Sequence, residues 1–290
     1  MTDQKNEKIF ILIPVNNRRE TTLSCLRSLH TDAVLANWQD LSIVMIDDGS
    51  TDGTELAVKS EFPAVKVLLG NGDLWWTGAI TKGMEYAIKQ QCAGIFWLND
   101  DCPPTPDSLV KMHLTSLNYD NAIIGASCYI SKTGGLQPTG ARGRTRIAAQ
   151  PGELLSVDEM SGHCVYIPRV VIDKIGFPDV RHFPHYHGDS NYVLRATRNG
   201  FKAYLLGDAK VSHAEIIKAK LEDFSLSGGT SPINSFRQTF LNKKSLYYLP
   251  TQFFYTTGKY GDSKGAILFL LKLFHWLSKW IVLTLAIRYR

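Results

Sequence analysis

The chain has 290 residues, of which 44% are hydrophobic and 20% charged, enough for one large core or two small ones. This balance excludes a chain dominated by disorder, and the net charge of +5 is too small to indicate nucleic-acid binding. The five cysteines form no CxxC pair, and the polar start MTDQKNEK lacks a signal peptide's apolar segment. We therefore expect a reduced, cytoplasmic protein.

The first third of the chain alternates between predicted strands and helices. Continuous apolar character predicts buried strands at 9–15, 41–46, 65–69 and 95–98. Helices are expected where Leu23, Leu26 and Leu29 share one face, and over 54–60 and 78–90. This alternation predicts an α/β fold with a mainly parallel sheet and helices on both faces, whose ligands bind beyond the carboxyl ends of the strands.

Several common enzyme classes lack their motifs here. The first strand is followed by PVNNRRE rather than a GxGxxG turn, which disfavours a dinucleotide-binding Rossmann domain. The chain also contains no GxxxxGK[ST] loop and no GxSxG elbow. The chemistry must then rest on carboxylates.

The fourth predicted strand ends abruptly in Asn99, Asp100 and Asp101. Adjacent carboxylates at a buried strand end are costly unless a cation neutralises them, and hard divalent ions prefer oxygen ligands. The alternative is a solvated turn with an Asp cap for a helix that starts near Pro106. This stretch alone leaves both interpretations open.

Four motifs together resemble a known family. IFILIPVNNR, VMIDDGSTDGT, FWLNDD and YHGDSNYVLRATRNG occur in the order and spacing of family-2 glycosyltransferases, which have the GT-A fold. The resemblance covers roughly residues 8 to 215. It implies a GT-A domain over 1–215, with a nucleotide-binding part at about 1–101 and an acceptor-binding part at about 102–215, followed by a helical tail over 216–290.

The resemblance assigns the nucleotide to the first two strand ends, at Pro14, Asn16, Arg18 and Asp47. A buried carboxylate can accept from a base N–H, and an arginine can meet a phosphate. For Asp48, Ser50 and Asp52 we favour an Asx turn and a helix N-cap, which need no ligand.

Residues 70–83, GNGDLWWTGAITKG, match the family's glycine-rich stretch beside the donor. Gly78 would let the backbone approach the nucleotide sugar closely. Trp75 and Trp76 cannot both face one core in an extended segment, so one of them is expected to line the sugar pocket. The alternative is that both indoles cap the core beneath a loop.

The turn at 99–101 matches the family's DxD motif, with Asn in the first acidic place. The resemblance implies that Asn99 and Asp100 contact the nucleotide sugar and that Asp101 binds Mg²⁺ or Mn²⁺ between the donor's two phosphates. His213 lies where many family members place a histidine near the metal or diphosphate. A second metal ligand and a purely structural histidine are both open for this position.

The acceptor half carries the expected base. Gly162 and His163 in SGHCVYIP are expected to line the acceptor cleft. The family's second acidic motif has Gly188 and Asn191 in two of its acidic places, which leaves Asp189 as the general base, or as a cap for a helix over 190–198.

Two further features of this half remain open. The stretch 131–152 holds Arg142, Arg144 and Arg146, either in a loop that closes over a diphosphate or in a solvated one. Three alternating histidines, at 182, 185 and 187, suggest a zinc site, but no fourth ligand accompanies them and we favour polar cleft residues.

The segment 265–287 is long enough to cross a bilayer. Lys272, His275 and Lys279 recur on one side, however, so we expect an amphipathic helix that lies on the inner membrane surface, with Trp276 and Trp280 as anchors. The alternatives are a helix packed on the catalytic domain and a homodimer contact through the C-terminal helices.

Together these features predict an inverting, metal-dependent glycosyltransferase of bacterial cell-surface polysaccharide synthesis. It would move a sugar from a nucleotide-diphosphate sugar to a lipid-linked or oligosaccharide acceptor at the cytoplasmic face of the membrane. The tryptophan-bearing glycine stretch and the GD motif resemble those of rhamnosyltransferases, so dTDP-rhamnose is the first donor to test. The alternatives are a non-catalytic glycan-binding or scaffold protein, indicated by Asn99, Gly188 and Asn191, and then a nucleotidyltransferase.

Overall fold

The computed structural model describes residues 8–32, 35, 37–214, 220–223 and 231–288. Its centre is a nine-stranded mixed sheet in the order β3-β2-β1-β4-β11-β5-β12-β9, with β6 paired to β5. The strands of this sheet are β1 (Ile9–Val15), β2 (Leu41–Asp47), β3 (Lys66–Leu69), β4 (Gly94–Leu98), β5 (Ile123–Ile130), β6 (Leu136–Gln137), β9 (Leu154–Ser156), β11 (Cys164–Pro168) and β12 (Ala203–His213).

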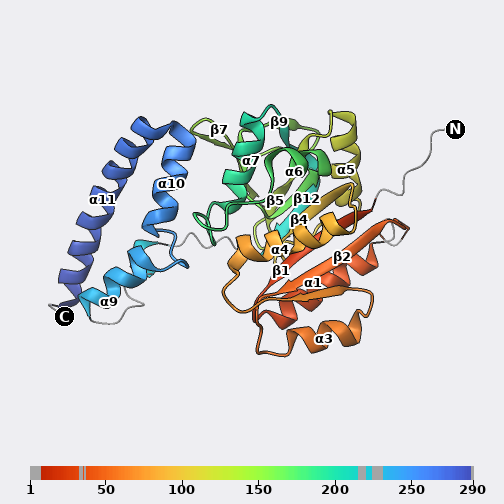
Figure 1. Cartoon of the computed structure of the whole chain (residues 1–290), viewed down its shortest axis with the longest axis horizontal. Helices are drawn as coiled ribbons and strands as arrows, with labels where there is room; N and C mark the ends of the chain where they lie inside the picture. The colour runs from red at the N-terminus through yellow and green to blue at the C-terminus, as the bar shows by residue number, and fades with distance from the viewer. Residues whose placement is uncertain (1–7, 33–34, 36, 215–219, 224–230, 289–290) are drawn as a thin grey trace.

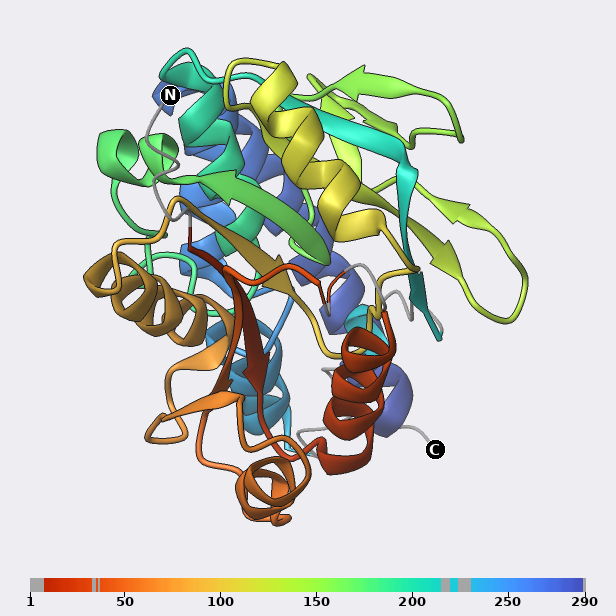
Figure 2. The ribbon, with the colours of Figure 1, turned by 90° about the vertical axis from the view of Figure 1, so that its right-hand side faces the viewer.

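Helices cover both faces of the sheet, and Figure 2 shows α1 and α5 on one side with α4 and α6 on the other. A smaller antiparallel sheet, in the order β10-β7-β8, is formed within residues 140–160. Its strands are β7 (Gly140–Arg142), β8 (Thr145–Ile147) and β10 (Glu159–Met160). The helices are α1 (Arg19–Thr31), α3 (Thr54–Glu61), α4 (Trp75–Lys89), α5 (Ser108–Asn118), α6 (Arg169–Ile175), α7 (Gly188–Arg198), α9 (Pro232–Phe236), the π-helix η1 (Arg237–Leu241), α10 (Leu249–Tyr260) and α11 (Asp262–Arg288).

The sheet is parallel where the sequence predicted it to be. Strands β3, β2, β1 and β4 run parallel to one another, and β5 and β12 form a second parallel pair. Strand β11 runs antiparallel between β4 and β5 and joins the two parts. The expected α/β fold with a mainly parallel sheet is therefore confirmed.

The continuous apolar character of β1 follows from burial on both faces. Ile11 and Ile13 pack into the core beneath α1 and α5, whereas Leu12 packs into the core beneath α4 and α7. Successive side chains of a strand point to opposite faces, so a strand covered on both sides needs apolar residues at every position. The apolar run of β1 ends where the chain leaves the sheet and its backbone contacts polar residues.

Three predicted boundaries differ from the structure. The sequence predicts two strands, over 203–206 and 209–212, but the structure has one strand, β12, with a register shift between Leu206 and Lys210. At Gly207 the backbone passes so close to the carbonyl of Gln150 that a Cβ would lie 1.7 Å from it, and only glycine fits. The helix expected from residue 78 already begins at Trp75, and the stretch 131–152 holds β6, β7 and β8.

Residues 231–288 form a C-terminal arm that extends from the sheet domain (Figure 1). Its longest helix, α11, packs one face on the rest of the arm: Trp280 contacts Phe236 and Phe240, Trp276 contacts Tyr247, and Phe269 contacts Phe253. Trp276 and Trp280 therefore face the arm's own core. Both indoles are still partly exposed, so their predicted role as membrane anchors stays a prediction.

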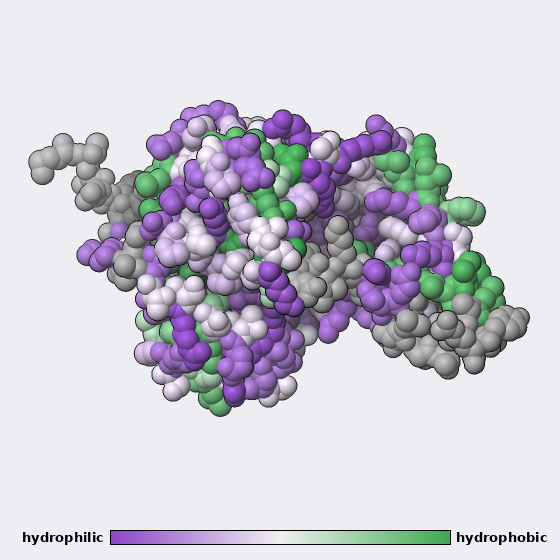
Figure 3. All heavy atoms as spheres, turned by 180° about the vertical axis from the view of Figure 1, so that it is seen from behind, coloured by the Kyte–Doolittle hydropathy of each residue, from purple (hydrophilic) through white to green (hydrophobic). Residues whose placement is uncertain are grey.

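The opposite face of α11 is exposed and apolar. Phe274 and Leu271 are 75% and 64% exposed. They belong to a row of large apolar side chains spaced three, four or seven residues apart, which we name the outer face: Ile267, Leu270, Leu271, Phe274, Ile281, Val282 and Leu285. Figure 3 shows hydrophobic side chains gathered over the arm. Among the described helices, α11 is also the one whose length and composition would suffice to span a bilayer.

Candidate active site

A hollow of about 500 Å³ lies at the carboxyl ends of β1 and β2. This is the edge at which ligands bind in parallel α/β sheets. Residues of the first strand end, of the stretch that follows β3 and of the C-terminal arm line it: Pro14, Val15, Asn16, Arg18, Asp48, Gly72, Trp75, Trp76, Ala79, His185 and Lys244.

Arg18 is the charged residue of the first strand end. Its guanidinium forms ion pairs with Asp101 at 2.7 Å and with Asp100 at 3.1 Å. Burial alone would lower the pKa of Arg18, but the two carboxylates outweigh it and raise that pKa. The structure thus brings Arg18 to the acidic turn, and the predicted contact of its guanidinium with a phosphate stays a prediction.

The two acids that end β2 face different partners. Asp47 is buried, and its Oδ1 accepts a hydrogen bond from the backbone N–H of Ser50, which closes a turn. Asp48 lines the hollow, and its two carboxylate oxygens accept from the backbone N–H groups of Gly72 and Trp75. The carboxylate of Asp48 therefore fixes the backbone of the stretch that follows β3, while a nucleotide contact by Asp47 stays a prediction.

The two tryptophans point to different places. Trp75 has a positive φ of 58°, a conformation held by its hydrogen bonds to Asp48 and to Asp73. The Trp76 indole N–H donates to Asn99 Oδ1 at 2.8 Å, which ties α4 to the end of β4. Gly78 lies in the second turn of α4, against Leu74, and is not among the lining residues. Both tryptophans line the hollow, whereas the sequence predicted that for one.

Some residues of the turn after β4 lie in the site, and others lie in the core. Asp100 is buried beneath the site, where its carboxylate accepts from Thr22 and pairs with Arg18. Burial is the main reason that the pKa of Asp100 is raised to about 6. A direct contact from Asp100 to a nucleotide stays a prediction, since the structure gives this residue a supporting position.

Asp101, Cys102 and His213 lie close enough to one another to hold one metal ion. One ligand atom from each residue lies within 4.8 Å of the others, and Asp101 Oδ2 is 3.5 Å from His213 Nε2. Carboxylate and imidazole ligands suit a divalent cation, and the carboxylate suits Mg²⁺ or Mn²⁺ in particular. The structure thus brings together the two residues expected to bind the metal, and adds the thiol of Cys102, which the sequence analysis missed.

Asp189 sits in the first turn of α7 with its carboxylate held by two backbone donors. Oδ2 accepts from the N–H of Gly162 at 2.5 Å, and Oδ1 accepts from the N–H of Ser190 at 2.6 Å. The helix cap is His187, so Asp189 is not the N-cap residue. A Cβ on Gly162 would lie 2.8 Å from the Trp76 ring and 2.9 Å from Asp189, so this glycine lets Asp189 lie close to the indole.

His163 contacts both the 99–101 turn and His213. Its carbonyl accepts from the N–H of Asn99, and its ring lies 6.1 Å from that of His213. Burial lowers the pKa of His163, so its ring is neutral near pH 7. Gly162, His163 and Asp189 are therefore contiguous with Asn99 and the 99–101 turn.

The three histidines at 182, 185 and 187 do not gather around one point. His182 pairs with Asp179, His187 stacks on Tyr255 at 3.9 Å, and His185 lines the hollow near Trp75. Among the described residues, His185 is thus the one of the three that lines the hollow, and the prediction of a polar cleft residue holds for this histidine.

The arginines at 142–146 lie in and beside the β7–β8 hairpin and contact neighbouring chain segments. Arg142 donates to the carbonyl of Ser156, and Arg144 lies 5.6 Å from the ring of Tyr260 in α10. The structure thus gives these two side chains contacts within the protein.

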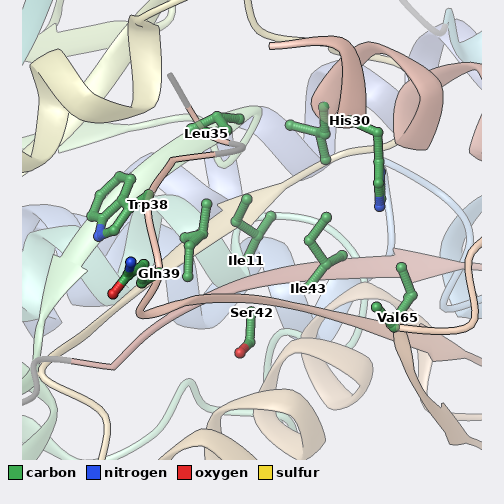
Figure 4. Close-up of a pocket in the computed structure, with 11 residues that line it drawn as sticks. Ile11, His30, Leu35, Trp38, Gln39, Ser42, Ile43 and Val65 are labelled. Carbon is green, nitrogen blue, oxygen red and sulfur yellow. The ribbon is translucent and has the colours of Figure 1, made fainter. Parts of the chain in front are cut away.

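A second hollow, of about 400 Å³, lies at the opposite edge of the sheet (Figure 4). It is lined by residues from the end of α1 and the starts of the strands, among them His30, Trp38 and Ile43. The strands begin rather than end here, so the acidic turns are on the other side of the molecule. Its mainly apolar lining carries none of the residues predicted for catalysis.

The fold and the site define a GT-A glycosyltransferase: a mainly parallel sheet with an acidic turn, a histidine and a carboxylate around a hollow at its carboxyl edge. Residues 10–176, more than half of the chain, match glycosyl transferase family 2, and the chain belongs to this family. The curated proteins contain no match to the chain.

Two solved structures support the fold. GalNAc-T7 with UDP, GalNAc and Mn²⁺ is 15% identical with a TM-score of 0.60, covering 85% of this chain and 51% of its own, so this chain spans about half its length. The mannosyltransferase PcManGT from Pyrobaculum calidifontis, with GDP-Man and Mn²⁺, is 12% identical with a TM-score of 0.57, covering 97% of this chain and 84% of its own. At these identities the similarity concerns the fold.

Proposed function

We propose that the protein is an inverting, metal-dependent glycosyltransferase that moves a sugar from a nucleotide-diphosphate sugar to a saccharide hydroxyl. The observation that supports it best is the continuity of the site, in which Asp189, Gly162, Trp76 and Asn99 form one chain of contacts. This chain leads to Asp101 in the metal-ligand group. A base and a metal ligand are thereby linked through residues that flank the space for a sugar.

Asp189 is the general base of the proposed reaction. Its carboxylate takes the proton of the acceptor hydroxyl while that oxygen forms a bond to the anomeric carbon of the donor sugar. The bond from the anomeric carbon to the diphosphate oxygen breaks on the opposite side, so the configuration inverts. The N–H groups of Gly162 and Ser190 fix the carboxylate in one orientation, which is the positioning that such a base requires.

Asp101 and His213, with Cys102 beside them, would hold the divalent cation, Mg²⁺ or Mn²⁺. Such a cation, when bound, offsets charge on the departing nucleoside diphosphate. Arg18 supplies a positive charge to the same region, since its guanidinium already lies against Asp101.

The proposed setting is bacterial cell-surface polysaccharide synthesis, with a lipid-linked acceptor at the cytoplasmic face of the membrane. The outer face of α11 supports a membrane surface as partner, because it exposes large apolar side chains along a helix whose other face packs on the arm. No acid follows Asp262, whereas Lys264, Lys272 and Lys279 do, so the helix also suits anionic lipid.

A panel of nucleotide sugars tests the proposal. Purified protein with Mn²⁺ or Mg²⁺ is screened with UDP, dTDP and GDP sugars for thermal stabilisation and for release of nucleoside diphosphate, with dTDP-rhamnose as the first candidate donor. We expect stabilisation and slow hydrolysis with one donor. That stabilisation should be lost in an Asp101→Ala variant, because the variant lacks a metal ligand. Binding that is equal with and without metal in the wild type would refute the metal dependence.

Absence of both signals across the panel, with metal present, would favour the second candidate, a non-catalytic glycan-binding or scaffold protein. This candidate is supported by Gly188 and Asn191, which stand where the family motif has acids. Glycan-array binding without nucleotide would then be the decisive measurement.

A further inference from the structure

The C-terminal arm contributes one side chain to the hollow at the sheet edge. Lys244 lines the hollow together with Asn16 and Trp75, although it lies far beyond the family match at 10–176. Its ammonium group is 4.9 Å from the centre of the Trp75 ring. A segment of the arm therefore forms part of the wall of this hollow.

The turn that carries Lys244 is ordered by its own hydrogen bonds. Asn242 accepts from the N–H of Lys244 through its side chain and from the N–H of Ser245 through its carbonyl. Ser245 is buried and accepts from the N–H of Tyr247. Gln252 of α10 donates to the carbonyl of Leu246 and ties the turn to the helix that follows. The position of Lys244 is thus set by the fold of the arm.

The acids near Lys244 are engaged elsewhere. The carboxylate of Asp48 accepts from two backbone N–H groups, and Asp73 accepts from the Trp75 indole and pairs with Lys243 at 3.4 Å. Among the ion pairs of the described residues, none joins Lys244 to a carboxylate. In the same wall, the buried Nδ1 of His185 has no hydrogen-bond partner within the described part of the chain. The hollow therefore offers a cation and a buried polar atom to a ligand.

We propose that Lys244 binds the diphosphate of the nucleotide donor and that the arm thereby forms part of the donor site. This inference rests on the proposed function. Arg18 and Lys244 lie in the same hollow, and two cations around a space of about 500 Å³ fit a ligand with two linked phosphates. In this proposal the nucleotide occupies the first strand end. Its diphosphate is therefore the phosphate group that lies in the same hollow as Arg18 and Lys244.

The test compares Lys244→Met, Lys244→Arg and Lys243→Ala with the wild type by calorimetry. Methionine keeps the unbranched stem over Trp75 without the charge, arginine keeps the charge, and Lys243 is the adjacent lysine that faces Asp73 instead of the hollow. The probes are UDP, dTDP and GDP with Mn²⁺, the matching nucleosides, and a water-soluble alkyl diphosphate that represents a phosphorylated acceptor. The thermal midpoint of each variant confirms that it is folded.

We expect Lys244→Met to weaken binding of the preferred nucleoside diphosphate about tenfold, since a charge-assisted hydrogen bond is lost, and to leave nucleoside binding unchanged. Lys244→Arg and Lys243→Ala should bind like the wild type. If a folded Lys244→Met variant binds the diphosphate as tightly as the wild type, the inference is overturned while the proposed function stands. A loss restricted to the alkyl diphosphate would overturn the donor assignment, and a wild type that binds no nucleoside diphosphate would overturn both proposals.

Discussion

The edge of the sheet around Asp101 and the outer face of α11 differ in whether their side chains have partners within the protein. At the edge, the carboxylates have internal partners: Arg18 faces Asp100 and Asp101, and backbone N–H groups hold Asp48 and Asp189. On the outer face, large side chains such as Phe274 stay exposed. A ligand at the sheet edge must therefore compete with contacts that already exist. A surface that covers α11 would instead bury apolar side chains that folding leaves exposed.

This difference has an energetic meaning. Charged groups that are already paired are pre-organised for a ligand, and little ordering remains to be done when it binds. An exposed apolar row gains its stabilisation only when another apolar phase covers it, at roughly 25 cal/mol per Å² of surface buried. The two regions should consequently respond to different kinds of substitution.

The largest effect is expected at the sheet edge, from Asp189→Asn. Transfer should fall between about a hundredfold and ten-thousandfold, because a positioned base is lost, while affinity for nucleoside diphosphate should stay near that of the wild type. Steady-state transfer rates and calorimetry measure the two quantities. A variant that retains more than about a tenth of the activity would refute the assignment of Asp189 as base.

The second prediction concerns a buried contact between the sheet domain and the C-terminal arm. Glu159 of β10 is buried and accepts from Tyr255 at 2.8 Å and from Lys259 at 2.5 Å, both in α10. Glu159→Gln would leave the nearly buried Lys259 without a counter-charge, and we expect a loss of about 3 kcal/mol in the free energy of unfolding.

Urea unfolding measures this loss, with Asp120→Asn as the matched control. The pair between Asp120 and Lys202 is exposed, so its removal should cost less than about 1 kcal/mol. Equal effects of the two substitutions would mean that the arm is not held to the sheet domain by this buried pair.

The third prediction addresses the outer face. Replacing Leu271 and Phe274 by Glu should reduce sedimentation with anionic liposomes at least about tenfold, since two large apolar contacts are lost and negative charge is added. Transfer to a soluble acceptor should be unchanged. Leu114→Glu, at an exposed leucine of α5, is the control that should still bind liposomes.

Other outcomes of that experiment distinguish the alternatives. Binding that resists both salt and carbonate extraction would indicate a transmembrane helix. Sedimentation without lipid that the double substitution abolishes would indicate a homodimer through α11 instead of a membrane contact.

The smallest effect is a pH dependence at the junction of the arm with α7. Burial, assisted by Lys272, Arg146 and Lys259, lowers the pKa of His187 to about 3, against about 6.5 in the unfolded chain. The folded state thus binds fewer protons below about pH 6.5, and the stability present above that pH is lost as the pH falls.

Between pH 7.5 and 5.5 the loss from His187 should be about 1 kcal/mol, measured as the difference in urea unfolding between the wild type and His187→Gln. Glutamine keeps a hydrogen-bonding side chain beside Gln252 and does not titrate. If both proteins lose the same stability over this range, His187 is not the group responsible.

The sequence allowed prediction of the fold where local pattern and tertiary environment agree. The apolar runs at β1, β2 and β4 end abruptly in polar residues, so both the strands and the edge that carries the site follow from the pattern. The proximity of Asp101 to His213 came from the family resemblance, since β12 reaches this edge only through the order of strands in the sheet.

The arm shows why the rest could not be predicted. The side of α11 that carries Trp276 and Trp280 and its outer face are both rich in apolar residues. The direction of the two tryptophans depends on Tyr247, Phe236 and Phe240, which no local rule connects to them. The same holds for Lys244, whose place in the hollow depends on how the whole arm docks. A periodic pattern defines the faces of a helix but not which of two similar faces finds a partner.

The docking of α10 and of the Lys244 turn has a consequence for biosynthesis. Ribosomes deliver the chain from its N-terminus, and domains fold in that order, so the segments that carry Asp48, Asp101 and Asp189 emerge before the arm. Tyr255, which stacks on His187 two residues before Asp189, arrives last among these. A nascent chain that stops before α10 would carry the acids without the arm residues that pack around them. The pocket is therefore complete only after α10 has been synthesised.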